Sequence, residues 1–393
     1  MFLQFYYGCV GLVELDFYER EPPIPSEDYF GVSFFDLRAY VYDILRGVGV
    51  SSEDSRIVAD VLVLADLFGI SSHGVQRTWR YVEGVKRGNV NINPDIRVIR
   101  DFGATALIDG DNGFGQVVGV KAMRLAIEKA KRFGVSMVLV RNSNHFGIAG
   151  YYSLMAVFEG LIGVTATNSS RLVAYVNTVE RFLGTNPIAI AIPKRNPPPI
   201  LFDAATSIIP VGRIEIYSKK GKSVPSGWVM DGRGEIIHGD AKAILEMVER
   251  GDAALLPLGG LGEELGGHKG SGLSFIVDLI SGVLSGALWS FHVGEIIGDR
   301  PANVGHFFSA INIEALMSLN EFFDRVERYI GEVKALRRHP KADRIWIPGE
   351  KAWLTMQTRL KTRIPLHRTV YNDLVRLGRE VGVDWKLRKL SLI

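Results

Sequence analysis

Apolar residues recur at helical spacing along the first hundred residues of the chain. Residues 34–45 carry apolar side chains every three or four positions and are followed by glycines at 47 and 49, which predicts a helix that ends there. The segment Ser51-Ser52-Glu53-Asp54 is typical of a helix N-terminus, so a second helix is expected from there to about Phe68. Ser71 or Ser72 can cap a third helix that runs to Val85. We therefore expect a helical unit over residues 31–95.

From residue 96 onward, short apolar runs alternate with amphipathic segments. This alternation predicts one domain of strands and helices over residues 96–340. A last amphipathic helix is expected at 368–381, within a C-terminal segment (341–393) that packs back on the helical unit. The expected strands are 104–109, 135–140, 162–167, 188–192, 200–202 and 307–313, and the expected helices are 116–133, 273–284 (buried) and 320–336.

The N-terminal residues 1–30 stand apart from this pattern. Residues 1–13 are apolar and aromatic, but they lack the basic region and cleavage site of a signal peptide and are too short to span a bilayer. Two interpretations stay open: a segment that packs on the body or on a partner, or residues upstream of the true start. No other run of about 18 apolar residues occurs, so we expect no membrane association.

Composition narrows the function. The chain has 393 residues, 47% of them hydrophobic and 23% charged, which is typical of a soluble globular enzyme. The net charge of +3 is spread without a long basic block, so no nucleic-acid partner is expected. A single cysteine, Cys9, excludes an internal disulfide and favours a reducing, cytoplasmic location. The histidines include no close pair at ligand spacing, so no metal site is expected.

Three polar segments flanked by glycine carry the candidate chemistry. His145 follows the predicted strand 135–140, and a histidine on a loop held by a strand can transfer a proton near neutral pH; a helix-capping role is the alternative. His73 and Arg77 lie four residues apart, so on a helix they would share a face and converge on one ligand. Lys269, in Gly267-His268-Lys269-Gly270, stands at an expected helix N-terminus that suits a phosphate or carboxylate. Together the three segments indicate an active site.

A glycine-rich turn at residues 113–119 invites comparison with dinucleotide-binding folds. Its spacing is G-x-G-x-x-x-G rather than G-x-G-x-x-G, and Arg141 ends the next strand where an acidic ribose ligand is expected. A turn that lets a loop approach a ligand or another subunit is the better interpretation. Residues 183–187 and 202–207 also place small polar side chains beside strands, either as simple turns or as close approaches to a flat ring.

Five motifs of the chain occur in the order found in one enzyme family. The chain resembles the type-2 malate/L-lactate dehydrogenases, which include L-sulfolactate and ureidoglycolate dehydrogenases and a cyclic-imine carboxylate reductase. The resemblance covers about residues 31–384 and leaves residues 1–29 outside. The motifs are Ser72-His73-Gly74 with Arg77, Asn144-His145-Phe146-Gly147, Gly184-Thr185-Asn186-Pro187, Asp203-Ala204-Ala205-Thr206 and His268-Lys269-Gly270.

The resemblance implies both a fold and a set of residue roles. The fold is α+β, with a non-Rossmann cofactor domain built on a mostly antiparallel or mixed sheet, beside a helical domain formed by both chain ends. The implied reaction is NAD- or NADP-dependent hydride transfer to or from a 2-hydroxy acid such as malate, lactate or sulfolactate, in a homodimer. His145 matches the proton donor/acceptor, and His73 and Arg77 match the substrate end. The implied cofactor contacts are Ser169, Thr185, Asn186, Asp203, Ala204, Ala205, His268, Lys269 and Gly349.

Two other functions stay open at this point. One is a reductase of a cyclic imine carboxylate, in which water rather than His145 handles the proton. The other is a nucleotide-binding protein without catalysis, against which the presence of His145, His73 and Arg77 together argues. The chain also has Glu263-Glu264 in a loop before Lys269 that is longer than in some family members, which leaves the role of that loop open.

Overall fold

The first helices form as the apolar spacing predicts. In the computed structural model, which describes residues 18–383, α2 spans Phe34–Gly47 and α3 spans Ser52–Leu67. The Ser51 hydroxyl accepts the Asp54 N–H at 3.1 Å and caps α3, so this predicted start is confirmed. The apolar faces of both helices are buried in the main hydrophobic core.

The third predicted helix begins later than expected. Two 3-10 turns, η2 (Ser71–His73) and η3 (Val75–Arg77), precede α4 (Thr78–Lys86). The Val75 N–H donates to the Asp66 carboxylate of α3 at 2.7 Å instead of continuing a helix. A Cβ atom at Gly74 would lie 2.3 Å from the same carboxylate, so only glycine fits. His73 therefore lies in a separate turn, and the predicted start of the third helix at Ser71 or Ser72 is wrong.

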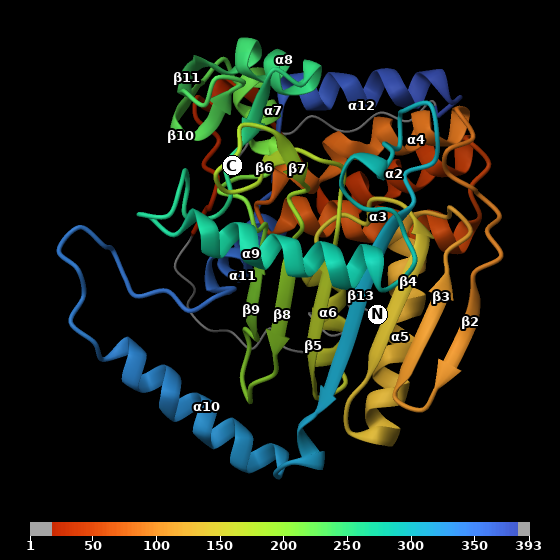
Figure 1. Cartoon of the computed structure of the whole chain (residues 1–393), viewed down its shortest axis with the longest axis vertical. Coiled ribbons are helices and arrows are strands. Elements are labelled where there is room, and N and C mark those ends of the chain that lie inside the picture. Colours follow the sequence, from red (N-terminus) through yellow and green to blue (C-terminus); the bar gives the residue numbers. More distant parts are fainter. Residues whose placement is uncertain (1–17, 384–393) are drawn as a thin grey trace.

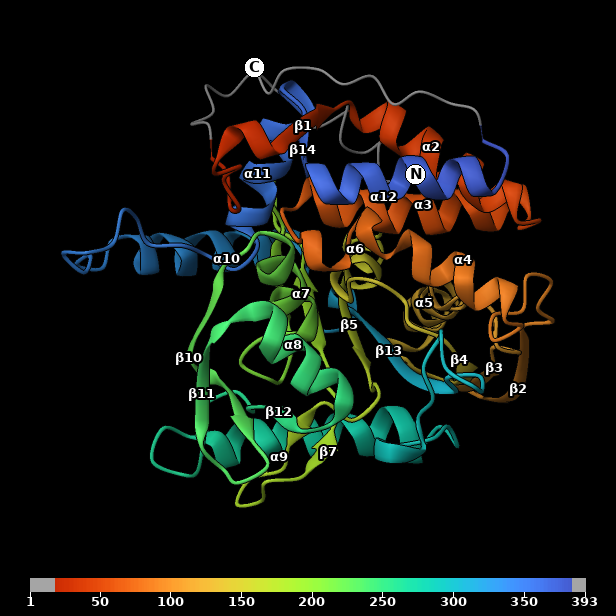
Figure 2. The ribbon, with the colours of Figure 1, turned by 90° about the horizontal axis from the view of Figure 1, so that it is seen from above.

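The C-terminal segment joins this helical layer, as Figure 2 shows. Strand β14 (Ile364–His367) pairs antiparallel with β1 (Tyr29–Val32), which follows the short 3-10 turn η1 (Ser26–Asp28). The predicted last helix is confirmed as α12 (Arg368–Glu380). It packs on α2, where the Tyr40 hydroxyl donates to the Leu374 carbonyl at 3.4 Å. Helix α11 (Glu350–Lys361) lies beside α3.

A seven-stranded sheet carries the body of the chain (Figure 1). Its neighbours are antiparallel except for β3 and β4, which are parallel and connected by α5 (Gly115–Phe133). Helices α5 and α6 (Gly150–Val157) cover the face toward the helical layer. The fold is thus α+β with mixed sheets. In order across the sheet, the strands are β2 (Arg97–Phe102), β3 (Thr105–Asp109), β4 (Met137–Ser143), β13 (Val304–Asn312), β5 (Leu161–Thr167), β8 (Ile188–Ile192) and β9 (Ile200–Ala204).

A second, five-stranded sheet has its own small core and was not predicted. It packs against α7 (Val211–Lys219) and α8 (Ala241–Arg250), with buried side chains such as Ile214, Val229 and Leu255. Its strands are short or interrupted, and β10 contains Pro225 and Gly227, so the sequence gives a weak alternating pattern here. In order they are β11 (Ile236–Asp240), β10 (Ser223–Asp231), β12 (Ala253–Leu255), β6 (Val173–Ala174) and β7 (Arg181–Leu183).

Helix α9 (Gly267–Asp278) crosses the other face of the large sheet and continues into a π-helical turn, η4 (Leu279–Val283). The prediction that this segment is buried is wrong for the single chain. Its side chains Leu273, Ile276, Leu279, Val283 and Leu284, called the α9 surface below, are 37–59% exposed. An apolar run cannot distinguish a core helix from one that faces another molecule.

The remaining helical elements lie at the periphery. Helix α10 (Leu319–Lys334) is an amphipathic helix without a buried residue, and Figure 1 shows it extending away from the body. Short 3-10 turns occur at Ser290–His292 (η5) and Ile313–Ala315 (η6). Between residues 18 and 383, no helix combines the length and apolar character needed to cross a membrane.

Candidate active site

The loop after β4 presents His145, and aromatic stacking fixes the loop. The ring of Phe146 stacks between those of His306 and Tyr152, with centroid distances of 4.6 and 4.8 Å. The Tyr152 hydroxyl also donates to the Phe146 carbonyl. The position of His145 is therefore fixed by the contacts of its neighbour, Phe146.

His306 is a core histidine rather than a reacting one. Its Nδ1 lies 2.7 Å from the Thr167 hydroxyl and its Nε2 lies 2.8 Å from the Ser143 hydroxyl. Burial lowers its pKa to about 3, so the ring is neutral at physiological pH. Both ring nitrogens are occupied by protein atoms, which leaves none for a substrate.

His145 and His73 form a stacked pair. Their ring centroids are 5.6 Å apart with an interplanar angle of 20°. His145 Nδ1 lies 2.6 Å from the Tyr81 hydroxyl, which leaves Nε2 as the ring nitrogen available to a ligand. Burial, together with the charges of His73 and Arg77, holds the pKa of His145 well below its usual range. Burial and then the Arg77 charge lower the pKa of His73 to about 4.

Two arginines share one carboxylate beside these histidines. Arg77 contacts both oxygens of Glu215 at 3.1 and 2.9 Å, and its Nε–H donates to the Ser72 carbonyl at 2.8 Å. Arg80 reaches Glu215 at 3.5 Å. A Cβ atom at Gly212 would lie 2.5 Å from the Arg77 guanidinium, so glycine makes room for this fork. Although burial opposes it, the positive charges of Arg77 and Arg80 keep the pKa of Glu215 below its ordinary value.

These groups face one cavity of about 870 Å³, a volume within the range of ligand and cofactor sites. The cavity lies between the helical layer, the large sheet and the second core. It brings together five of the predicted site residues: His73, Arg77, His145, Ser169 and Thr185. The predicted convergence of His73 and Arg77 on one space is therefore confirmed, although they are not on one helix.

Short polar residues build one wall of the cavity. Ser169 Oγ accepts the Thr185 N–H at 3.1 Å, and Asn186 Oδ1 accepts the Ser169 N–H at 3.1 Å. Asn186 Nδ2 donates to the Ser274 carbonyl of α9 at 3.1 Å. The Asn186 side chain thus holds this wall together, while Ser169 and Thr185 line the cavity.

The other predicted cofactor residues lie around the end of β9 and do not line this cavity. Asp203 Oδ2 accepts the Gly150 N–H at the start of α6 at 2.8 Å, and burial raises the pKa of Asp203 to about 6. Gly349 packs against Leu201, two residues before Asp203. His268 and Lys269 are exposed at the start of α9. Ala204 and Ala205 follow Asp203 at the end of the strand.

Two backbone hydrogen bonds connect the cavity wall with the residues around the end of β9. The Leu258 N–H, in the loop before α9, donates to the Thr206 carbonyl at 2.9 Å. The Thr206 N–H donates in turn to the Thr185 carbonyl at the cavity wall at 2.9 Å. The residues around β9 therefore adjoin the cavity at Thr185.

The glycine-rich turn at 113–119 is filled by the protein itself. A Cβ atom at Gly115 would lie 2.0 Å from the Asn144 carbonyl oxygen, and one at Gly119 would lie 2.7 Å from the Tyr152 ring. Asn144 Nδ2 also donates to the Gly113 carbonyl at 3.0 Å. These glycines let α5 pack closely against the His145 loop, and they leave no room for a diphosphate between the two.

The residues that the sequence analysis missed include Arg80, Tyr81 and Glu215, which line the cavity, and Gln116, which is buried beside Tyr81. Arg80 and Tyr81 follow Arg77 by three and four positions, so helical spacing from Arg77 is the signal that points to them. Gln116, in the first turn of α5, gives no such signal. Glu215 is 138 residues from Arg77 in sequence, and only the packing of α7 brings it there.

A stacked, partly buried histidine pair beside two arginines, at a cavity of cofactor size, is typical of an enzyme that moves protons on a small anionic substrate. The sequence profile of the malate/L-lactate dehydrogenase family matches residues 32–375, and the chain belongs to this family. The chain is thus a dehydrogenase of the malate/L-lactate family.

Individual relatives agree with this assignment over nearly the whole chain. A malate dehydrogenase of Pyrococcus abyssi is 52% identical over 91% of this chain and 97% of its own length. An L-sulfolactate dehydrogenase of Methanocaldococcus jannaschii is 38% identical, over 88% of this chain and 95% of its own. The solved structure of malate dehydrogenase from Pyrococcus horikoshii superimposes with a TM-score of 0.86 at 47% identity, covering 94% of this chain and all of that one.

Proposed function

We propose that this chain transfers a hydride between a nicotinamide cofactor and C2 of a small 2-hydroxy acid, with malate as the first substrate to test. The observation that carries the proposal is the stacked pair of His145 and His73 next to Arg77 and Arg80 in one cavity. The histidines supply an acid–base group, and the arginines supply charge for an acid. The names of the Pyrococcus relatives point to malate.

Proton handling falls to Nε2 of His145. When a 2-hydroxy acid is oxidised, its hydroxyl proton leaves as the hydride departs from C2, and neutral imidazole accepts that proton. The low pKa of His145 keeps the ring neutral at physiological pH, which suits this direction. Reduction of the 2-oxo acid needs the imidazolium form, so reduction should become slower relative to oxidation as the pH rises.

The two guanidinium groups of the cavity offer donors for a substrate with two acid groups. Two guanidinium groups face one carboxylate, Glu215, which leaves one positive charge uncompensated among these three. Three of the five N–H groups of Arg77 are engaged, so two stay free to bind the C1 carboxylate. Arg80 holds Glu215 at a longer distance, 3.5 Å, and lines the same cavity. We assign Arg80 to the second acid group, which malate has and lactate lacks.

The cavity and its polar wall fit a nicotinamide cofactor. When bound, NAD or NADP supplies or accepts the hydride. Ser169 and Thr185 line the cavity with short side chains that let a flat ring approach. Asp203, Ala204, Ala205 and Gly349 around β9 would hold the rest of the molecule. Lys269 adds an exposed positive charge at the N-terminus of a twelve-residue helix, which favours a phosphate.

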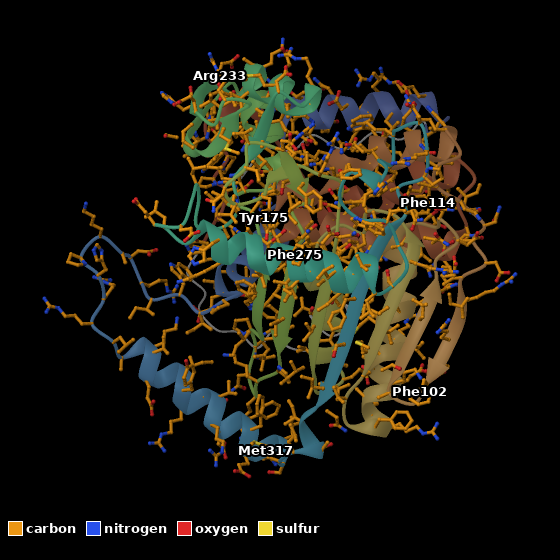
Figure 3. The ribbon with its side chains drawn as sticks, in the orientation of Figure 1. Phe102, Phe114, Tyr175, Arg233, Phe275 and Met317 are labelled. Carbon is orange, nitrogen blue, oxygen red and sulfur yellow. The ribbon has the colours of Figure 1, made fainter. Side chains whose placement is uncertain are left out.

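A homodimer formed through the α9 surface completes the proposal. A run of apolar side chains that are 37–59% exposed is unusual on a monomer surface and typical of an interface. Figure 3 labels Phe275 in the middle of α9, where its ring meets that of Tyr175 edge to face at 6.2 Å. A second copy of the chain is the occupant we assign to this face. Ile276→Glu should shift the sedimenting mass from dimer to monomer. Phe102→Glu is the control, because Phe102 is 86% exposed on β2 and far from α9.

The function is tested by mixing the protein with NADH or NADPH and following absorbance at the nicotinamide band. Oxaloacetate, pyruvate, sulfopyruvate and a cyclic imine carboxylate are supplied in turn. We expect oxidation of the cofactor with oxaloacetate at a higher kcat/KM than with pyruvate. Turnover of the cyclic imine alone would contradict the proposal, and it would move the assignment to imine reduction.

Arg80→Gln sharpens this test. The variant should lose kcat/KM toward oxaloacetate by roughly ten-fold or more, as expected when a charged hydrogen bond of about 1.5–3 kcal/mol is removed. Its kcat/KM toward pyruvate should change little. An equal loss of kcat/KM for oxaloacetate and pyruvate would show that Arg80 does not bind the second acid group.

A further inference from the structure

Tyr81 reaches from α4 to the reacting histidine. Its hydroxyl lies 2.6 Å from Nδ1 of His145, a short distance for a hydrogen bond, and the two ring centroids are 6.1 Å apart. The side chain is 1% exposed. Burial raises the pKa of Tyr81 well above its usual value, so the hydroxyl keeps its proton throughout the working pH range. The Gly147 N–H approaches the same Nδ1 only at 3.4 Å.

A buried amide stands beside the same hydroxyl. Gln116, in the first turn of α5, is fully buried. Its amide lies next to the Tyr81 hydroxyl. Among residues 18–383, neither its Nε2 nor its Oε1 makes a hydrogen bond of normal geometry. A buried amide without partners is costly, so its place next to the hydroxyl needs an explanation.

The chemistry of His145 provides that explanation. Both reactive forms of the ring, the neutral base with a free Nε2 and the imidazolium, carry a hydrogen on Nδ1. That Nδ1–H must donate to the Tyr81 oxygen, so the Tyr81 hydrogen must turn to another acceptor. Oε1 of Gln116 is such an acceptor. Without it, the hydroxyl would donate to Nδ1 and hold His145 in the tautomer whose Nε2 already carries a hydrogen.

We propose that Tyr81 is a positioning residue for the proposed dehydrogenase reaction and that it acts together with Gln116. The chain of hydrogen bonds runs from His145 Nδ1–H to the Tyr81 oxygen, and from the Tyr81 O–H to Gln116 Oε1. During oxidation, the substrate hydroxyl proton moves to Nε2, and the Nδ1 and Tyr81 hydrogens stay in place. Tyr81 thereby sets the tautomer and stabilises the imidazolium.

Tyr81→Phe tests the proposal because it removes only the hydroxyl. We expect kcat for oxidation to fall roughly ten- to a hundred-fold, the order seen when a partner that orients a functional histidine is lost. Substrate KM and cofactor affinity should stay nearly unchanged. The imidazolium loses its acceptor, so the pKa of His145 falls and the rising limb of the oxidation pH profile moves to lower pH. A folded Tyr81→Phe protein with wild-type kcat and an unmoved limb would overturn the proposal.

Substitutions at Gln116 separate the two halves of the hydrogen-bond chain. Gln116→Met removes the acceptor and should lower kcat as Tyr81→Phe does. Gln116→Glu keeps an acceptor oxygen and adds negative charge, so it should retain activity and move the limb to higher pH. Tyr40→Phe is the matched control, since it removes a buried hydroxyl that donates to the Leu374 carbonyl in the helical layer and does not touch the His145 loop. It should lower stability and leave the limb in place; a shifted limb would count against a specific role for Tyr81.

The inference rests on the proposed function, and one measurement separates their failures. Nitrogen chemical shifts of His145, recorded by NMR on the protein without substrate, distinguish the two neutral tautomers. We expect the Nδ1–H form in the wild type and a larger share of the Nε2–H form in Gln116→Met. The Nε2–H form in both proteins would overturn the hydrogen-bond chain even if the protein oxidises malate. Failure of all acids in the turnover assay would instead refute the function.

Discussion

The two halves of the candidate site are built differently. Around the cavity, Arg77 is buried, whereas His145 and His73 are partly buried. Tyr81 of α4 holds His145 and Glu215 of α7 holds Arg77, while His73 contacts the neighbouring Ser72 hydroxyl and stacks on His145. Around β9, His268 and Lys269 are exposed at a helix end, the Asp203 carboxyl caps the start of α6, and the alanines and Gly349 offer small side chains and backbone. Proton transfer requires fixed geometry away from water, whereas a long cofactor can be held by many weak contacts. Substitutions in the first half should therefore change turnover, and those in the second should change affinity for the cofactor.

The largest effect is expected from His145→Ala. Loss of a general acid–base group lowers kcat by about 10²- to 10⁴-fold. Affinity for NAD(P)H, measured by fluorescence titration, should hardly change. Near-normal turnover between pH 6 and 9 would remove His145 from the chemistry and erase the contrast between the two halves.

Arg77→Lys should have the next largest effect. Lysine keeps the charge but loses the planar fork that contacts both oxygens of Glu215. We expect the KM of the 2-oxo acid to rise roughly ten- to a hundred-fold, from about 1.5–3 kcal/mol for a charged hydrogen bond. Steady-state kinetics at saturating NADH measures the KM of the 2-oxo acid in the variant and the wild type. An unchanged KM would mean that another residue, with Arg80 the nearest candidate, binds the C1 carboxylate.

Lys269→Ala should act on the cofactor alone. An exposed ion pair between the lysine and a phosphate contributes about 0.2–1 kcal/mol, so the Kd of NAD(P)H should rise by roughly 1.5- to five-fold. The kcat at saturation should stay the same. A loss of kcat without a change in Kd would contradict the division of labour.

Gly115→Ala is the counterpart for the other glycine-rich turn. Its Cβ would collide with the Asn144 carbonyl, so the melting temperature should fall while the folded protein keeps its Kd for NAD(P)H. A bound-cofactor structure with the diphosphate on residues 113–119 would show that the two turns have been assigned the wrong way round.

The smallest effect concerns pH and His73. With a folded pKa of about 4 against about 6.5 in the unfolded chain, the unfolded state binds more protons between these values. The stability that His73 contributes is therefore present above pH 6.5 and is lost as the pH falls toward 4. Relative to His73→Asn, the wild type should lose at most ~2 kcal/mol of unfolding free energy between pH 7 and 5.

Denaturant titrations at several pH values measure that difference. The raised pKa values of Asp66, about 7, and Asp203, about 6, act in the opposite direction, but in both proteins, so they cancel. If the wild type instead gains unfolding free energy relative to His73→Asn as the pH falls, His73 is charged in the folded state.

Local signals predicted much of the fold. Ser51 and the acidic residues after it marked the start of α3, and continuous apolar runs marked β4, β5 and β8. The second sheet was not predicted, because strands of two or three residues, such as β6 and β12, are too short to show a periodic pattern. The exposure of α9 escaped because its apolar pattern is that of a core helix. Which residues surround a candidate histidine is decided by tertiary packing, as Glu215 shows.

The Arg77–Glu215 pair has a further consequence for the protein without substrate. The two residues come from the helical layer and from the second core, and both are largely buried. Glu215 thus acts as an internal surrogate for a bound acid and spares the empty cavity an unpaired guanidinium, which would cost about 3–5 kcal/mol. Measurements of the melting temperature should show that Glu215 and a bound acid substrate can replace each other beside Arg77. Glu215→Gln should melt at a lower temperature, and the acid substrate should restore more of the lost stability to this variant than it adds to the wild type.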